Sequence, residues 1–292
     1  MFYRQPTFQL ACSSILFGLG AVFVVLIDLD ASIIAFYRLS LGAVIFGFLL
    51  FLRRERLLIS LPALLFASLS GVFLGLDLSL WNASILLVGP GIATILNSLQ
   101  IFFMAAFGIV IYGNLPDKRL WLGLVITFVG VILLCNKEMA AGEQGSLGVV
   151  TGILSGLAYA ISMLSIREAA KYQQHSLINT MFYASIAGAL ATGLYGIISD
   201  NSFITNELSS WLMIIIYGIF VHVLAWFLMA KSIPHVSLAI AGLLMALEPV
   251  VVFIVDLWGL DKVVSNWQVV GAVLTIVSVY LGTQSKHEES DR

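Results

Sequence analysis

Ten long apolar stretches follow one another along the chain, separated by short polar segments. Each has about 20 residues, the length an α-helix needs to cross roughly 30 Å of hydrocarbon while satisfying its own backbone hydrogen bonds. The pattern therefore predicts an all-α integral membrane protein with ten transmembrane helices. The predicted spans are residues 8–27, 32–52, 61–80, 90–112, 120–136, 147–166, 176–198, 211–230, 235–257 and 266–283.

The composition agrees with a lipid environment. Of the 292 residues 60% are hydrophobic and 10% are charged, and so few charged side chains cannot form the hydrated surface of a soluble protein of this size. The net charge of −2 argues against a nucleic-acid partner, because phosphate binding needs a surplus of Lys and Arg. Cys12 and Cys135 have no metal-ligand spacing, so we expect neither a metal site nor a disulfide framework.

Basic residues predict the orientation, because Lys and Arg remain on the cytoplasmic side during insertion. With the N-terminus inside, the predicted outer loops hold only Lys137 and Lys262, and Arg38 falls inside a span. We therefore expect a multi-pass protein of the inner (cytoplasmic) membrane with both termini in the cytoplasm. The basic residues of the predicted cytoplasmic segments are Arg4, Arg53, Arg54, Arg56, Lys118, Arg119, Arg167, Lys171, Lys231, Lys286 and Arg292.

The chain repeats itself at an offset of 148 residues. ATILNSLQI (93–101) aligns with AGLLMALEP (241–249), which places Gln100 opposite Glu248. An odd number of spans per half inserts the second half upside down, and such inverted repeats can expose one central site alternately to either side. We predict a first five-helix repeat over 1–137, an outer connecting loop over 138–146, a second repeat over 147–283 and a cytoplasmic tail over 284–292. Stripes of small residues, Gly71 with Gly75 and Gly152 with Gly156, are typical of close helix packing.

The span count, the two halves, YRLSLGAV around Arg38 and ALEP around Glu248 together resemble the EamA-type drug/metabolite transporter superfamily. Ile101 departs from the pattern, since it replaces the proline expected in the first half. The resemblance implies a ten-helix inner-membrane carrier, working more often in the export of amino acids or related metabolites than in uptake.

Glu248 is the sharpest candidate for a functional residue. It lies near mid-membrane, where an ionised group costs roughly 2.5–3.5 kcal/mol or more, and such groups face a cavity or a partner. Pro249 follows at once and frees the carbonyl of Met245, which makes it a candidate hinge. Glu248 is interpreted as a proton site or a ligand for a substrate amine, and a glutamate that only holds helices together is the alternative. Its repeat partner Gln100 is an uncharged candidate at the same depth.

Arg38 lies about 9 Å from the predicted outer face, at a level that Asp77 also reaches. Two interpretations stay open: a clamp for a substrate carboxylate, to which the guanidinium fork is suited, or an internal ion pair with Asp77 that joins helices. Asp77 shares a helix face with Trp81, and Asn97 shares one with Gln100.

Histidine and aromatic residues at comparable depth complete the candidate site. His222 lies one turn from Trp226 on the same predicted face, and it is either a packing residue or a proton relay. Tyr37, Tyr159 and Trp226 are candidates to line a central cavity through stacking or cation–π contacts, the alternative being simple core packing.

We therefore expect a secondary active transporter that moves a small polar or amphipathic metabolite across the bilayer by alternating access. The chain has no G-x-x-x-x-G-K-[ST] loop to use ATP, and no clustered His, Asp or Glu suggests an enzyme. No cofactor is expected, and monomer and homodimer both stay open. The alternative function is an accessory membrane subunit of a flippase for a lipid-linked substrate.

Overall fold

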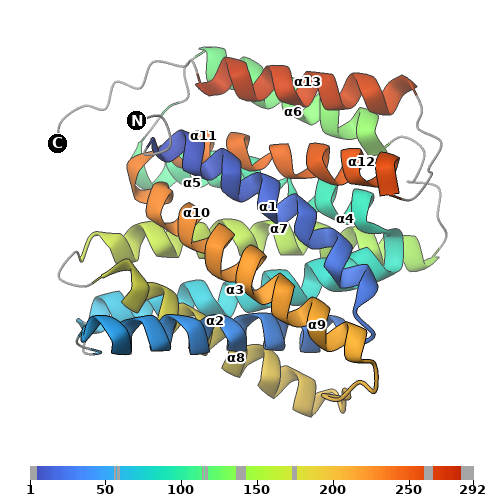
Figure 1. Cartoon of the computed structure of the whole chain (residues 1–292). Coiled ribbons are helices and arrows are strands. Elements are labelled where there is room, and N and C mark those ends of the chain that lie inside the picture. Colours follow the sequence, from blue (N-terminus) through green and yellow to red (C-terminus); the bar gives the residue numbers. More distant parts are fainter. Residues whose placement is uncertain are drawn as a thin grey trace.

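The computed structural model describes residues 5–55, 57, 60–113, 115, 118–135, 143–172, 176–259 and 266–283, and all its regular elements are helices. Helices lie side by side in layers, and α1 and α10 cross the others in Figure 1. The helices of the first half are α1 (Pro6–Leu26), α2 (Ala31–Arg53), α3 (Leu61–Val88), α4 (Pro90–Asn97), α5 (Gln100–Tyr112) and α6 (Lys118–Cys135).

The second half begins with α7, which starts at Glu143 and so occupies part of the predicted 138–146 loop. Residues 136–142 and the predicted tail lie outside the described part of the chain. The elements of this half are α7 (Glu143–Ala170), α8 (Leu177–Ile198), α9 (Leu208–Ile216), the π-helix η2 (Tyr217–Ala225), α10 (Trp226–Ser232), the short 3₁₀ helix η3 (Ile233–His235), α11 (Leu238–Met245), α12 (Leu247–Gly259) and α13 (Asn266–Thr283).

The helix ends follow local sequence rules. Pro6, Pro62 and Pro90 stand in the first turns of α1, α3 and α4, where the missing N–H costs nothing. α5 ends at Gly113, whose φ of +67° is the left-handed conformation that glycine adopts most readily. Ser176 caps α8 by accepting a hydrogen bond from the Asn179 backbone N–H.

Seven helices in the described residues are long and apolar enough to cross a membrane. The remaining three predicted spans coincide with α6, with the pair α11 and α12, and with α13, so the count of ten spans stays a prediction. Large apolar side chains cover the outside, including Phe51 at 78% exposure and Val110 at 82%. Such a surface is unfavourable in water and suits lipid.

Two predicted spans are interrupted, at equivalent places. α4 ends at Asn97 and α5 begins at Gln100, while α11 ends at Met245 and α12 begins at Leu247. With the offset of 148 residues the two breaks coincide. The second break stands beside Pro249, but the first forms although Ile101 occupies the position expected for a proline.

Helices from the two halves pack directly against each other. The predicted repeat partners α2 and α8 are in contact, as are α6 and α13, and the two equivalent cross-contacts, α5 with α11 and α4 with α12, are both present. The stripe on α3 packs as expected, because a Cβ at Gly71 would collide with the Ala184 carbonyl of α8 and one at Gly75 would lie 3.0 Å from the Gly188 carbonyl oxygen. The prediction that these small residues form a packing face is confirmed.

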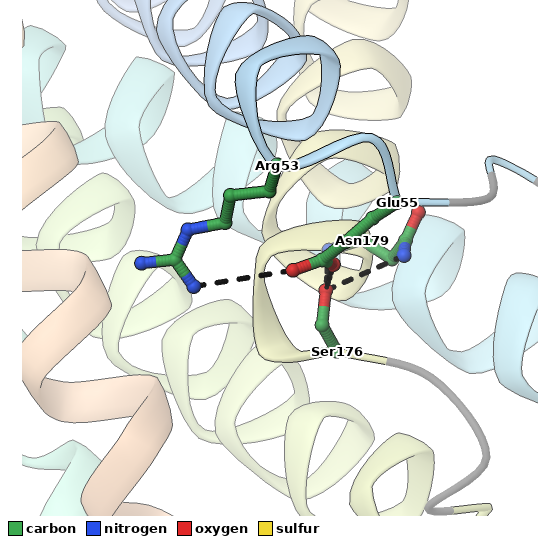
Figure 2. Close-up of polar contacts among 4 residues, drawn as sticks. All are labelled: Arg53, Glu55, Ser176 and Asn179. Carbon is green, nitrogen blue, oxygen red and sulfur yellow. Dashed lines mark hydrogen bonds and ion pairs between the residues drawn. The ribbon is translucent and has the colours of Figure 1, made fainter.

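Polar contacts tie α2 to α8 at the end of the bundle predicted to be cytoplasmic. Figure 2 shows Glu55, just after α2, accepting a hydrogen bond from the Ser176 hydroxyl. The same carboxylate lies 3.9 Å from Nη1 of Arg53, and Nδ2 of Asn179 donates to Ser176 at 3.4 Å. This cluster therefore joins the end of α2 in the first half to the start of α8 in the second.

Candidate functional site

The break beside Glu248 creates the local chemistry that the sequence predicts. Because Pro249 has no N–H, the carbonyl of Met245 lacks a helical donor, and the hydroxyl of Ser14 on α1 donates to it at 3.2 Å. The predicted freeing of this carbonyl is confirmed. Glu248 falls in the first turn of α12, where the exposed N–H groups of a helix favour negative charge.

Glycines bring neighbouring helices against both breaks. A Cβ at Gly18 of α1 would lie 2.9 Å from the carbonyl oxygen of Glu248, and one at Gly156 of α7 would lie 2.7 Å from the carbonyl oxygen of Asn97. Only a residue without a side chain permits this approach. α1 and α7, the first helices of the two predicted repeats, thus each pack closely against the break in the opposite half.

A small cavity lies between the two breaks. Its volume of about 20 Å³ holds about one water molecule and no metabolite. Six of the predicted site residues line it, namely Arg38, Asp77, Trp81, Asn97, Tyr159 and Glu248, together with Phe17, Leu74 and Leu78. The sequence therefore located most of the polar wall, and it missed Phe17 and the two leucines. We call this space the central cavity.

Aromatic side chains, and no carboxylate, hold the guanidinium of Arg38. Its Nη1 donates to the hydroxyl of Tyr217 at 2.5 Å, and its Cζ lies 4.6 Å from the centre of the Tyr217 ring and 5.7 Å from that of Phe17. Nε of Arg38 is buried without a hydrogen-bond partner. No ion pair within 4.0 Å joins Arg38 to Asp77, so the ion pair considered from the sequence is not formed between these described residues.

The side-chain amide of Asn97 holds Asp77. Nδ2 of Asn97 donates to Oδ1 of Asp77 at 2.8 Å and lies 2.9 Å from Oγ of Ser155. These contacts join α3, α4 and α7 at the first break. Asp77 is therefore a fixed acceptor in the cavity wall.

Glu248 differs from Asp77 in having no partner. Its residue is 5% exposed, and its side chain makes no hydrogen bond or ion pair with any described residue. Nε1 of Trp81, in the same wall, also lacks a partner. A buried carboxylate that lines a cavity without a partner is the group most available to a proton or a ligand.

Four predicted residues lie outside the central cavity. Tyr37 precedes Arg38 and so points about 100° away around α2; its hydroxyl donates to the Phe203 carbonyl at 2.7 Å, which corrects its assignment to the cavity. Gln100 is 1% exposed, and neither polar atom of its side chain finds a partner in the described structure. His222 and Trp226 stack as predicted, at 6.4 Å between ring centres. Both are fully buried, so Trp226 does not line the cavity.

The π-helix η2 helps to explain why His222 and Trp226 lie outside the central cavity. η2 carries Tyr217 and His222 and ends just before Trp226, and its wider turn shifts the faces expected for an α-helix. Nε2 of His222 lies 3.1 Å from Oγ of Ser185, while its Nδ1 has no described partner. Tyr217, which contacts Arg38, is a further residue that sequence reasoning missed, since a 3.6-residue period carries no sign of a π-helix.

Two larger cavities lie at opposite ends of α3, which spans the bundle. One, of about 920 Å³, is named here the Glu207 cavity; it is lined by Asp28, Asp30, Glu207 and neighbouring residues at the end predicted to be outside. The other, of about 300 Å³, is named the Lys231 cavity. Its lining is Ala63, Ile166, Ala169, Ala170, Tyr172, Leu177, Thr180, Ala230, Lys231, Pro234 and His235.

In the described residues no group of three or more His, Cys, Asp or Glu side chains could hold a metal ion. The helical fold, its apolar exterior and the buried polar cavity define a multi-pass membrane protein. The EamA-like transporter family matches residues 7–136 and 146–283, nearly the whole chain. The chain belongs to this family, and the resemblance inferred from its motifs is confirmed.

Individual relatives agree with this assignment. An Archaeoglobus fulgidus protein named as an uncharacterized transporter is 23% identical over 286 residues, covering 95% of this chain and 96% of its own. A solved crystal structure shares the fold with a TM-score of 0.78 at 13% identity, covering 95% of this chain and 96% of that one. Family and relative point to a transporter and not to an enzyme.

Proposed function

We propose that this protein is a secondary carrier that moves a small amphipathic metabolite across the inner membrane by alternating access. The observation that carries the proposal is the pair of helix breaks at repeat-equivalent positions, with Glu248, Arg38 and Asp77 buried between them. Secondary transporters commonly bind their substrates at a buried site where interrupted helices end.

The packing supports an inverted repeat. The predicted repeat partners α2 and α8, and α6 and α13, touch each other, as helices beside a twofold axis do, and Gly18 and Gly156 lie against the two breaks. The family also matches two segments of similar length, 7–136 and 146–283. Two halves of this kind can exchange conformations and so present one site to each side in turn.

The cavities support a closed state of such a cycle. The central cavity admits about one water, so a metabolite can enter only if one end opens. The two larger cavities lie where such openings would begin. Either the gradient of the solute itself or the proton gradient would drive transport, and the proton gradient would act through Glu248. We propose that the protein exports an amino-acid-like solute.

The side chains favour a zwitterionic substrate. Arg38 has a buried, unpartnered Nε that can donate to a carboxylate, and Glu248 can accept from an amine. Phe17, Trp81 and Tyr159 supply apolar surface beside them. This combination fits an amino-acid-like molecule with an apolar side chain.

The orientation proposed for this carrier has a simple test. With both termini in the cytoplasm, an engineered cysteine beside Lys137 should react with an impermeant thiol reagent added outside whole cells, and one beside Lys118 should not. The reverse pattern would overturn the orientation.

Counterflow with the purified single chain tests the proposed function. The solute is first chosen by thermal stabilisation of the detergent-solubilised protein against a panel of amino acids and related metabolites. Liposomes loaded with that unlabelled solute should then accumulate labelled solute transiently, whereas protein-free liposomes should not. Activity that appears only after a second membrane protein is added would favour the accessory flippase subunit and contradict the carrier.

Arg38→Lys gives a prediction about binding. Lysine keeps the charge but cannot present a planar fork or retain the same contact with Tyr217, so the apparent substrate constant for a carboxylate solute should rise about tenfold. The matched control is the amide of the same solute, whose constant should not change. An unchanged constant for the carboxylate would show that Arg38 is only structural.

A further inference from the structure

α7 lines both the central cavity and the Lys231 cavity. It places Tyr159 in the central cavity and Ile166, about 10 Å further along the helix, in the Lys231 cavity, followed by Ala169 and Ala170. α10 places Ala230 and Lys231 in the Lys231 cavity, directly after Met229. The stretch of α7 between Tyr159 and Ile166 therefore lies between the two spaces.

Buried methionines lie on this stretch of α7 or next to residues that line the Lys231 cavity. The hydroxyl of Tyr159 donates to Sδ of Met229 at 3.0 Å. Met163 lies one turn from Tyr159 on α7, and Met181 lies one turn after Leu177, which lines the Lys231 cavity on α8. Met163, Met181 and Met229 are all 0% exposed and belong to one core cluster.

These side chains suit a contact that breaks and reforms. A thioether is a weak hydrogen-bond acceptor, and methionine has a flexible, unbranched side chain that repacks at low cost. Arg167, next to Ile166 on α7, donates to the carbonyls of Ile233 and Val236, in the segment between α10 and α11. α7 is thus joined both to α10 and to the segment that follows it, and separating these contacts would open the Lys231 cavity towards the central one.

The Lys231 cavity also has the size and chemistry of an access chamber. Its volume of about 300 Å³ falls at the lower end of the range for small-molecule sites. Alanine, isoleucine, leucine and proline side chains form much of its wall, and its polar or titratable lining residues are Tyr172, Thr180, Lys231 and His235. It therefore suits an amphipathic solute that carries an anionic group.

We propose that the Lys231 cavity is the access chamber on one side of the membrane and that the contact between Tyr159 and Met229 is the gate that closes it from the central site. This proposal rests on the proposed carrier function. It assigns a new role to Met229, which neither lines the central cavity nor stands out in the sequence, and it makes Tyr159 a gating residue as well as a cavity residue.

Cysteine accessibility tests the gate without knowledge of the substrate. In a chain with Cys12 and Cys135 replaced, Thr180→Cys reports on the access chamber and Leu78→Cys on the central cavity. A charged, impermeant methanethiosulfonate is added to either side of vesicles that hold the full-length protein. Thr180→Cys should react from one side, and Leu78→Cys should react at least about tenfold more slowly from that same side.

Opening the gate should remove this difference. Met229→Ala is expected to raise the reaction rate of Leu78→Cys about tenfold, and Tyr159→Phe, which keeps the ring and loses only the hydroxyl, should raise it about threefold. Met104→Ala is the matched control, because Met104 on α5 is equally buried and does not adjoin the Lys231 cavity. It should leave the rate unchanged.

Three results would overturn the gate. Equal rates for Leu78→Cys and Thr180→Cys would show that nothing closes the chamber. An equal rise with Met229→Ala and Met104→Ala would show general loosening of the core. No reaction at Thr180→Cys from either side would show that water does not reach the cavity, as expected if lipid fills it. Failure of counterflow with the accessibility pattern intact would instead contradict the carrier function alone.

Discussion

Glu248→Gln is expected to abolish the pH dependence of transport and to reduce proton-driven accumulation to the level of protein-free vesicles. Glutamine has nearly the same shape as glutamate but cannot exchange a proton. Glu248 is buried in the wall of the central cavity and has no hydrogen-bond partner among the described residues, so the substitution removes no packing contact on which folding depends. Initial rates of labelled solute uptake in proteoliposomes, measured over an acid-to-alkaline series, give the profile.

Asp77→Asn is the matched control in the same cavity. Asp77 already accepts a hydrogen bond from Asn97, so its carboxylate is held in place and we assign it no proton transfer. The variant should keep the wild-type pH profile even if its rate falls. A wild-type profile in Glu248→Gln, or a lost profile in Asp77→Asn alone, would contradict the assignment of the proton site to Glu248.

Gly71→Ala is expected to destabilise the protein by about 3 kcal/mol, the upper part of the range for overpacked cores. The new Cβ would collide with the backbone of Ala184, and the two backbones are also close one turn further along α8, where a Cβ at Gly188 would lie 2.6 Å from the Gly71 carbonyl oxygen. The apparent unfolding midpoint in detergent, followed by circular dichroism, measures the loss.

Gly108→Ala provides the comparison for Gly71. Gly108 also lies inside a helix, but a Cβ there would meet no atom within 4 Å. Alanine has the higher helix propensity, so this variant should be as stable as the wild type or slightly more so. Equal midpoints for the two variants would contradict close packing of α3 on α8.

Most of the helical architecture could be predicted because apolar length is a strong signal in a membrane protein. The break beside Glu248 was also visible, since Pro249 removes a donor from the helix. The first break was not: Ile101 gives no local sign, and only alignment with the second half locates the interruption at Asn97. A repeat can therefore carry information that a local residue pattern lacks.

The depth of the candidate site residues in the membrane could be predicted from the sequence, but their contacts could not. Rise per residue placed Arg38 and Asp77 at one level and Glu248 nearer the middle of the membrane, and all three line one cavity. Rotation of each helix about its axis decides which side chains meet, and the sequence does not give it. For this reason Arg38 contacts Tyr217 and not Asp77, and Tyr37 contacts the segment at Phe203 and not the cavity.

Pulsed electron–electron distance measurements test alternating access most directly. One spin-label pair, at Leu26 and Ile204, reports on the Glu207 cavity, and another, at Tyr172 and Lys231, reports on the Lys231 cavity. In lipid, addition of the stabilising solute should increase the distance within one pair and decrease it within the other. The population of the longer distance should therefore rise for one pair and fall for the other. Two pairs that widen together, or that both keep a single distance whatever the solute and pH, would contradict a carrier with one alternately exposed site.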